Sequence, residues 1–148
     1  MNRSECRETI FKLLFVRHFS EEEEMQDQVE RYLASLKEGR EDAPYGETIR
    51  ESDELYIEEK LKAVTEVTPE LDALLEEVSE GWKVSRMNKV DLSILRLATY
   101  EILYDREIPT GVAINEAVEL AKIFGGDESP SFVNGILGKI ARRTEGSL

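Results

Sequence analysis

Residues 88–124, NKVDLSILRLATYEILYDREIPTGVAINEAVELAKIF, decide the fold of this chain. Apolar residues recur in this stretch at helical spacing, namely Val90, Ile94, Leu97, Ala98 and Ile102 before the Pro/Gly connection and Ile114, Ala117, Val118, Ala121 and Phe124 after it. This period fits amphipathic helices and does not fit strands. We therefore predict a helical hairpin at the core of an all-α domain.

The ends of the hairpin carry capping residues. Asn88 is the predicted N-cap of the first helix, and Asp91 stands three residues later, where an acidic side chain suits the positive end of the helix dipole. The second helix is predicted to stop at Gly125 and Gly126, because glycine accepts the left-handed conformation that often follows a helix.

Similar apolar stripes outside the hairpin bring the predicted total to about seven helices. The candidate starts of the other helices are Ser4, Ser20, Thr68 followed by Pro69, and Ser129 followed by Pro130. The stretch between Glu38 and Ser52 holds glycines and a proline without a sustained period, so it is predicted to be a loop. We expect a single domain over residues 1–148, with an N-terminal half of about 1–66 and a C-terminal half of about 67–148.

Composition excludes several classes of protein. The chain has one cysteine, Cys6, and one histidine, His18, which excludes an internal disulfide and a zinc site of the usual Cys/His type. It contains no phosphate-binding glycine loop, nucleophile elbow or metal-spaced acid cluster, so we expect no cofactor, no metal and no catalytic residues. We find no signal peptide and no apolar run long enough to span a bilayer, and we expect a cytoplasmic protein.

The net charge of −13 is unevenly distributed. Residues 1–20 carry +2, residues 21–80 carry −15, and residues 81–148 carry no net charge. An acidic protein repels a nucleic acid, but the two ends of this chain are neutral to basic and could approach phosphate if they lie together. The acidic middle could equally serve solubility alone, and the sequence leaves both interpretations open.

Aromatic residues outside the hairpin give three further hypotheses. Phe11, Phe15 and Phe19 form a stripe along the first helix that is either buried in the core or kept for a partner. Trp82 is predicted to be a buried anchor at the junction of the two halves. Phe132 falls about a quarter-turn from the apolar stripe of the last helix, so it is either a flank contact or an exposed stacking platform.

Three segments carry a family resemblance: VDLSILRLATYEI, IPTGVAINEAVELAKIFG and FVNGIL. In this order and spacing they resemble the NusB family of bacterial transcription antitermination factors. The resemblance is dense from Trp82 to Ile140, looser in residues 1–20 and nearly absent from the acidic middle. It implies two packed helical bundles, no catalytic activity, and binding of boxA RNA from ribosomal RNA operons together with NusE, a small-subunit ribosomal protein, within the RNA polymerase antitermination complex.

The resemblance also implies roles for individual residues. The RNA surface of the family corresponds here to Arg3, Arg7, Lys122, Ser131 and Phe132, with Phe132 stacking on a base. The partner surface corresponds to Phe15, Phe19 and Asp91 at the NusE contact. The chain has two separated arginines in place of a dense basic run, and Pro130 and Ser131 where a basic pair can occur, which predicts weak RNA binding without NusE. The sequence leaves open whether the partner-free protein is a monomer or a homodimer, and the aromatic stripe would be the self-association surface of a homodimer.

Two alternatives remain. NusB-like modules are also fused to ribosomal-RNA cytosine methyltransferases, but those enzymes need a long catalytic domain, and we expect none here because the chain ends at Leu148. An unrelated helical enzyme could use Glu116 and Glu119 as metal ligands on one helix face, although acids at this spacing are more often solvated surface residues.

Overall fold

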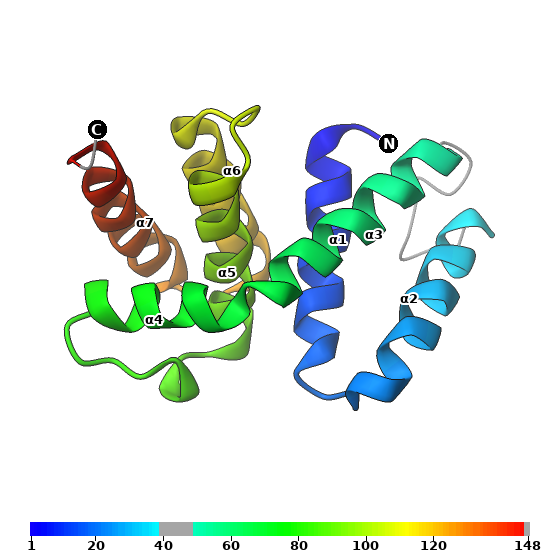
Figure 1. The fold of residues 1–148 in the computed structure, drawn as a ribbon, viewed down its shortest axis with the longest axis horizontal. Coiled ribbons are helices and arrows are strands. Elements are labelled where there is room, and N and C mark those ends of the chain that lie inside the picture. Colours follow the sequence, from blue (N-terminus) through cyan, green and yellow to red (C-terminus); the bar gives the residue numbers. More distant parts are fainter. Residues whose placement is uncertain (39–48, 147–148) are drawn as a thin grey trace. The chain divides into compact units, whose positions relative to one another are not determined.

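The computed structural model describes residues 1–38 and 49–146, and its regular structure in these ranges is helical (Figure 1). In chain order, the elements are α1 (Arg3–Arg17), α2 (Glu22–Lys37), α3 (Glu51–Glu66), α4 (Thr68–Val78), the 3-10 helix η2 (Val84–Arg86), α5 (Lys89–Tyr104), α6 (Thr110–Phe124) and α7 (Ser129–Gly146). The predicted all-α class with about seven helices is confirmed. Over these two ranges, we find no strand and no helix that is long and apolar enough to cross a membrane.

The chain divides into two compact units, Met1–Ala63 and Val64–Leu148, which we describe separately. The division lies three residues before the boundary between the two predicted halves, and it falls within α3. The predicted loop between Glu38 and Ser52 lies largely on residues 39–48, outside the described residues, and its last two positions already belong to α3.

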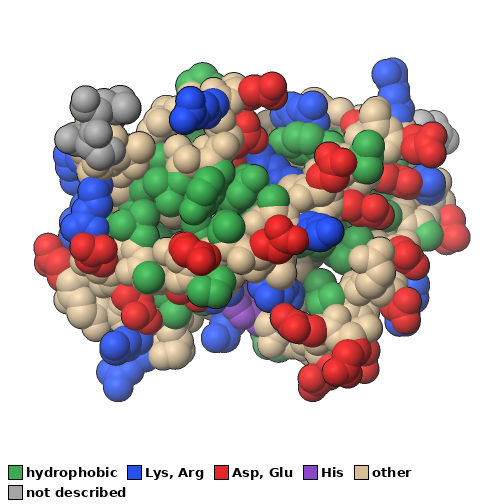
Figure 2. All heavy atoms as spheres, in the orientation of Figure 1, with side chains coloured by type: hydrophobic (Ala, Val, Ile, Leu, Met, Phe, Trp, Pro, Cys, Tyr) green, Lys and Arg blue, Asp and Glu red, His purple; other side chains and the backbone are tan. Residues whose placement is uncertain are grey.

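The first unit contains α1, α2 and most of α3. Its helices bury one apolar face each, and the buried residues include Cys6, Ile10, Leu13 and Leu14 of α1, Val29, Leu33 and Leu36 of α2, and Ile57 and Leu61 of α3. The acids in the first turn of α2 are exposed, as the sequence pattern predicts for a solvated helix start (lower right in Figure 2).

The start of α3 in the first unit is held by one carboxylate. Asp53 is 9% exposed, and its Oδ2 accepts a hydrogen bond from the Arg50 N–H (3.0 Å) and lies 3.1 Å from the Met1 ammonium. Burial by itself raises the pKa of Asp53, but these two partners outweigh burial and hold the pKa below its ordinary value.

The second unit is built on α5, as the sequence predicts. On α5, every residue of Asp91–Leu97 except Arg96 is buried. The helices α4, α6 and α7 all pack against α5. Arg96 of α5 forms a bidentate pair with Asp72 of α4, with two N···O distances of 2.8 Å. Such a charge-assisted fork adds fixed geometry to the apolar contacts. The hairpin α5–α6 is therefore the centre of this unit.

The predicted N-cap of α5 is confirmed, because Asn88 Oδ1 accepts hydrogen bonds from the backbone N–H groups of Val90 (2.8 Å) and Asp91 (3.2 Å). The four other predicted starts are wrong by one or two residues. Asn2, and not Ser4, caps α1 in a capping box with Glu5. Ser20 and Thr68 donate their hydroxyl hydrogens to the carbonyls of Val16 and Val64, so each is bonded to the preceding helix and caps nothing.

Candidate functional site

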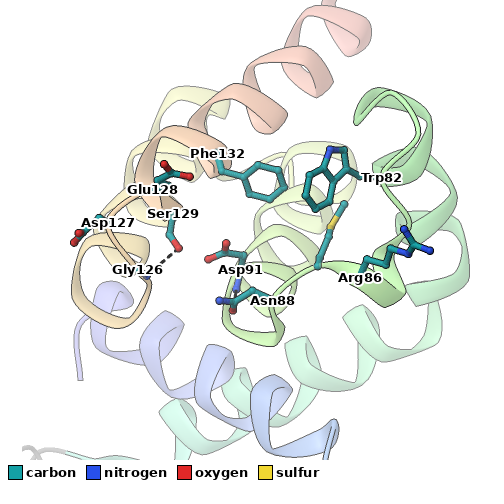
Figure 3. A pocket seen from close by; sticks show the side chains of 10 residues that line it. Trp82, Arg86, Asn88, Asp91, Gly126, Asp127, Glu128, Ser129 and Phe132 are labelled. Carbon is teal, nitrogen blue, oxygen red and sulfur yellow. Dashed lines mark hydrogen bonds between the residues drawn. The ribbon is translucent and has the colours of Figure 1, made fainter.

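A cavity of about 670 Å³ lies in the second unit at the starts of α5 and α7 (Figure 3). It is open to solvent on one side, and three parts of the chain build it: the connection that carries η2, the first turn of α5, and the α6–α7 connection with the first turn of α7. The lining residues are Trp82, Arg86, Met87, Asn88, Asp91, Gly126, Asp127, Glu128, Ser129 and Phe132. We call it the Asp91 pocket.

One wall of the Asp91 pocket is aromatic. The ring centroids of Trp82 and Phe132 are 6.4 Å apart with an interplanar angle of 57°, and Figure 3 shows the two rings side by side. Trp82 is 57% exposed, so the prediction of a buried anchor between the two halves is wrong. The residue before it, Gly81, has a φ of +100°, which turns the chain away from α4 into a surface connection where the indole packs against Phe132.

Phe132 stands on the first turn of α7, half-buried, with its ring directed toward Trp82. The buried face of α7 is made by Val133, Ile136, Leu137 and Ile140. Phe132 therefore lies off the apolar stripe, as the helical projection predicts. The sequence did not decide whether Phe132 is a flank contact or an exposed stacking platform. In the structure its ring contacts Trp82, and part of the ring surface remains accessible to solvent.

Asp91 is a buried residue of the pocket lining. It is 7% exposed, and Figure 3 shows its carboxylate pointing into the space beside the Phe132 ring. Its Oδ1 is buried and accepts no hydrogen bond from any residue that the structure describes. A buried carboxylate without a partner is costly, by several kcal/mol per ion in general. Its position near the start of α5 offsets part of this cost through the helix dipole.

The α6–α7 connection brings the last wall into place through a close approach at Gly125. A Cβ atom at this position would lie 2.5 Å from Ser129 Cβ and 2.8 Å from the Ala121 carbonyl oxygen, so only glycine fits. Gly125 is extended (φ −91°, ψ −177°), and the predicted left-handed conformation is therefore wrong. Ser129 is the first residue of α7 and not its cap, because its Oγ accepts a hydrogen bond from the Gly126 N–H (3.0 Å).

The charges around the pocket favour a cation. Asp91, Asp127 and Glu128 line it together with a single base, Arg86. Asp127 and Glu128 are exposed at the rim, and Figure 3 shows the side chains of both Arg86 and Asp127 directed away from Asp91. The sequence identified Asp91 and Phe132 as site residues for two different ligands, and the structure brings both into one pocket. It also adds Trp82 and Arg86, which sequence reasoning did not assign to a site.

The other predicted site residues of the second unit lie on its surface. Lys122, near the end of α6, is exposed and forms an ion pair with Glu119 one turn earlier, at 3.1 Å. Ser131 is exposed in the first turn of α7, next to Phe132. Glu119 is thus half of a surface ion pair, and over the described parts of the chain no group of three or more acids, histidines or cysteines could hold a metal ion.

The predicted site residues of the first unit have unequal access to solvent. Arg3 is exposed, and its guanidinium carbon lies 3.8 Å from the centroid of the Tyr56 ring. Arg7 is only 6% exposed, so it offers little surface to a phosphate, contrary to the sequence expectation. Phe19 is 69% exposed, and its ring meets the half-buried Phe15 edge to face with a centroid distance of 5.2 Å. Phe11 is buried, so the aromatic stripe is divided between core and surface.

Several known proteins with similar sequences carry one family name. A sequence profile of the NusB family matches residues 4–142. The transcription antitermination protein NusB of Lachnoclostridium phytofermentans is 46% identical over 140 residues, which cover 95% of this chain and 98% of the relative. The protein of the same name from Agathobacter rectalis is 48% identical, with 95% of this chain and 100% of the relative covered.

Solved structures with similar folds include a member of the same family. NusB of T. maritima superposes with a TM-score of 0.77 at 30% identity, covering 100% of this chain and 99% of that protein. A structure of the antitermination factors NusB and NusE in complex with double-stranded RNA contains a chain that superposes with a TM-score of 0.73 at 19% identity, covering 95% of this chain and 96% of that one. At this lower identity, the likeness concerns the fold alone.

Proposed function

This chain belongs to the NusB family, and we propose that it is a transcription antitermination factor that binds boxA RNA together with NusE. Its role in the cytoplasm is that of an adaptor within the antitermination complex of RNA polymerase, without catalytic activity of its own. The observation that carries the proposal is Phe132, a half-exposed aromatic ring on a helix start, off the buried face. The family resemblance assigns this position to the RNA.

The proposed RNA-binding residues of the second unit are Phe132, Ser131 and Lys122, and that of the first unit, taken by itself, is Arg3. Base stacking on an aromatic ring tolerates any base and contributes about 1–3 kcal/mol. Lys122 is exposed and needs only to exchange Glu119 for a phosphate, and an exposed ion pair of this kind contributes little to stability. Arg7 is omitted from this surface because it is buried.

We propose that the protein alone binds RNA weakly. The affinity of a protein for single-stranded RNA falls with salt by a slope of about 0.7 for each phosphate contacted. Among the proposed RNA-binding residues, only Arg3 and Lys122 are exposed cations. Residues 21–80 add a charge of −15 that repels the polyanion. A basic protein docked beside the RNA would extend the binding surface and reverse the local potential.

The proposed NusE-binding residues are Phe15 and Phe19 in the first unit and, taken separately, Asp91 in the second. Phe19 is the most exposed of the large hydrophobic residues in the described ranges, and a ring left in solvent at 69% exposure is typical of a contact surface. Asp91 offers a carboxylate to a basic partner. The same phenylalanines would associate two copies of the chain when NusE is absent.

The test is a titration of labelled boxA RNA at several salt concentrations, with and without NusE, with an RNA of scrambled boxA sequence as the control. We expect weak binding with a shallow salt slope for the protein alone, and tighter binding with a steeper slope when NusE is present. Equal affinities and equal slopes in the two series would refute the proposal that NusE completes the RNA surface. Equal binding of the scrambled RNA would refute boxA recognition.

A further inference from the structure

We propose that the connection between α4 and α5 is a further RNA-binding surface, on which Trp82 stacks on a base and three exposed cations contact the phosphates beside it. The cations are Lys83, Arg86 and Lys89, and we call them the basic cluster. The inference rests on the proposed function, because it takes RNA as the ligand. It goes further by extending the RNA surface of the second unit beyond Phe132 and Lys122.

The sequence of this connection has a period of three. Residues 83–91, KVSRMNKVD, repeat a base, an apolar residue and a polar residue three times. Val84 and Val90 are half-buried and Met87 is buried, whereas each of the three bases is exposed. This spacing fits the 3-10 helix η2, because side chains three positions apart in a 3-10 helix lie above one another. The pattern therefore buries the apolar residues and leaves the basic cluster in solvent.

Hydrogen bonds fix the path of the connection. Glu76 Oε1 of α4 accepts a hydrogen bond from the Val84 N–H at 3.1 Å. The Arg86 N–H donates to the Lys83 carbonyl at 3.0 Å, which closes one turn between two bases of the cluster. The burial of Met87 anchors the same turn. The backbone of the basic cluster is therefore held in place before a ligand arrives, which lowers the cost of ordering it on binding.

The basic cluster has charges to spare. Its side chains form no ion pair with any residue that the structure describes, whereas four other cations of the second unit have an acidic partner, namely Arg96, Lys122, Lys139 and Arg143. Lys89 also stands in the first turn of α5, where the helix dipole disfavours a cation. Neighbouring cations without partners repel one another, and a polyanion would relieve this repulsion.

The aromatic pair beside the basic cluster indicates a nucleic acid. Trp82 directly precedes Lys83, is 57% exposed, and packs against the ring of Phe132, the proposed stacking residue. The two ring planes differ by 57°, so the rings present separate faces to bases. Figure 3 shows Arg86 on the Trp82 side of the pocket and Asp127 on the opposite side. The phosphates of a strand that reaches Phe132 are therefore attracted toward the basic cluster and repelled from the α6–α7 connection.

A basic protein fits this surface less well. The protein partner proposed for Asp91 is basic, so the basic cluster repels it. Contacts to phosphates carry no sequence information, and stacking on an aromatic ring tolerates any base. The connection therefore adds affinity for the strand that continues from Phe132, and leaves the recognition of boxA to other residues.

The experiment measures the affinity of the full chain for labelled boxA RNA with oligouridine flanks, at stepped salt concentrations and with saturating NusE. The cluster variant replaces all three bases together: Lys83→Gln, Arg86→Gln and Lys89→Gln. The control variant removes the same charge from exposed positions elsewhere in the second unit: Arg106→Gln, Arg142→Gln and Arg143→Gln.

The salt slope is the decisive readout. We expect it to fall by about 2 in the cluster variant, because each phosphate contact on a single strand contributes about 0.7. Lowering the salt concentration fourfold should then widen the affinity gap between wild type and cluster variant by about twentyfold. The control variant should keep a slope close to that of wild type. Both variants should keep the wild-type melting temperature, since the replaced side chains are exposed.

Trp82 is tested separately by Trp82→Ala. Loss of a stacking ring should lower RNA affinity about fivefold or more at every salt concentration and leave the salt slope unchanged, because the ring carries no charge. Tyr104→Ala is the control, since Tyr104 is also exposed and packs against the ring of Tyr100. RNA should quench the fluorescence of Trp82, the single tryptophan of the chain.

Three results would overturn the inference. A wild-type salt slope in the cluster variant, or an equal fall in both triple variants, would show that the basic cluster contacts no phosphate. A loss of NusE affinity in the cluster variant, measured by calorimetry without RNA, would assign the connection to the protein partner. Unchanged RNA affinity in Trp82→Ala, with no quenching in the wild type, would show that no base stacks on Trp82. In these cases the proposed function stands, whereas a wild-type chain that does not bind boxA RNA with NusE present overturns both.

Discussion

Asp53 in the first unit and Asp91 in the second occupy the same position of a helix and have opposite environments. Each is the third residue of its helix, α3 or α5, and they are 9% and 7% exposed. Asp53 accepts a hydrogen bond from the Arg50 N–H and pairs with the Met1 ammonium. Asp91 Oδ1 accepts nothing within the described ranges. One carboxylate is paired within the fold, and the other has a buried oxygen without a partner among the described residues.

The residue three positions earlier differs between the two helices. Before α5 this residue is Asn88, whose side chain accepts hydrogen bonds from the backbone N–H groups of Val90 and Asp91. Before α3 it is Arg50, which has no acceptor in its side chain, and Asp53 reaches back to the Arg50 N–H. A cap does not by itself exclude this second contact, because in α1 Asn2 caps the helix and Glu5 still accepts a hydrogen bond from the Asn2 N–H.

The largest expected effect that would test this comparison is on folding. Asp53→Asn removes a charge that two partners stabilise, so we expect a loss of about 2–3 kcal/mol in the free energy of unfolding, measured by urea denaturation. Glu51→Gln is the matched control, since it removes an exposed acid from the same turn of α3. Equal losses in the two variants would show that the contacts of Asp53 contribute nothing specific.

Acid should remove the contribution of Asp53. Its pKa is held below the ordinary value in the folded chain, because the Arg50 N–H and the Met1 ammonium outweigh the effect of burial. The stabilisation is therefore complete above the pKa of the unfolded chain and is lost as the pH falls through the lower, folded value. We expect the stability difference between wild type and Asp53→Asn to shrink over that range, as measured by urea denaturation at stepped pH. A difference that is constant with pH would contradict the pairing.

The next effect concerns the pocket that contains Asp91. Phe132→Ala should cost about 1–3 kcal/mol of affinity for boxA RNA in the presence of NusE, because the stacking surface is lost. The melting temperature should change little, since Phe132 lies off the buried face of α7. Asn134→Ala, at an exposed position of the same helix outside the proposed RNA surface, is the control for effects on α7. A large drop in melting temperature with unchanged RNA affinity would make Phe132 a core residue.

A smaller effect is expected for the other ring of the pocket. Trp82 is 57% exposed, so Trp82→Ala should change the free energy of unfolding by about 0.5–1 kcal/mol, the range for one aromatic contact. Trp82 is the single tryptophan of the chain, and its fluorescence should therefore report the pocket alone, with an emission maximum close to that of a solvated indole. A strongly blue-shifted maximum would show that the indole is covered.

The two rings also show how far the sequence determines the site. Helical spacing predicted the hairpin, the Asn88 cap and the position of Phe132 off the stripe, because all three depend on residues within a few turns of one helix. The position of Trp82 depended on which element covers a connection, which spacing does not encode. The convergence of Asp91 and Phe132 depended on the path between α6 and α7, where Gly125 permits a contact that any side chain would prevent. The prediction that Arg7 is accessible was wrong for the same reason as the prediction for Trp82. Its residue type indicated a surface position, whereas its packing in the fold buries it.

The smallest expected effect is the change in the free energy of unfolding caused by Asp91→Asn in the free protein. Its sign distinguishes Asp91 from Asp53. The change relieves the burial of an unpaired charge, which raises stability, and removes a favourable interaction with the α5 dipole of about 0.3–1 kcal/mol, which lowers it. We expect the two effects to offset each other. The free energy of unfolding, measured by urea denaturation, should then be nearly equal in the wild type and the variant, or slightly higher in the variant. A loss as large as that of Asp53→Asn would mean that Asp91 is paired in the folded chain. Saturating NusE should reverse the order, because a bound partner stabilises the chain in proportion to the logarithm of its affinity, and the wild type then gains more than the variant.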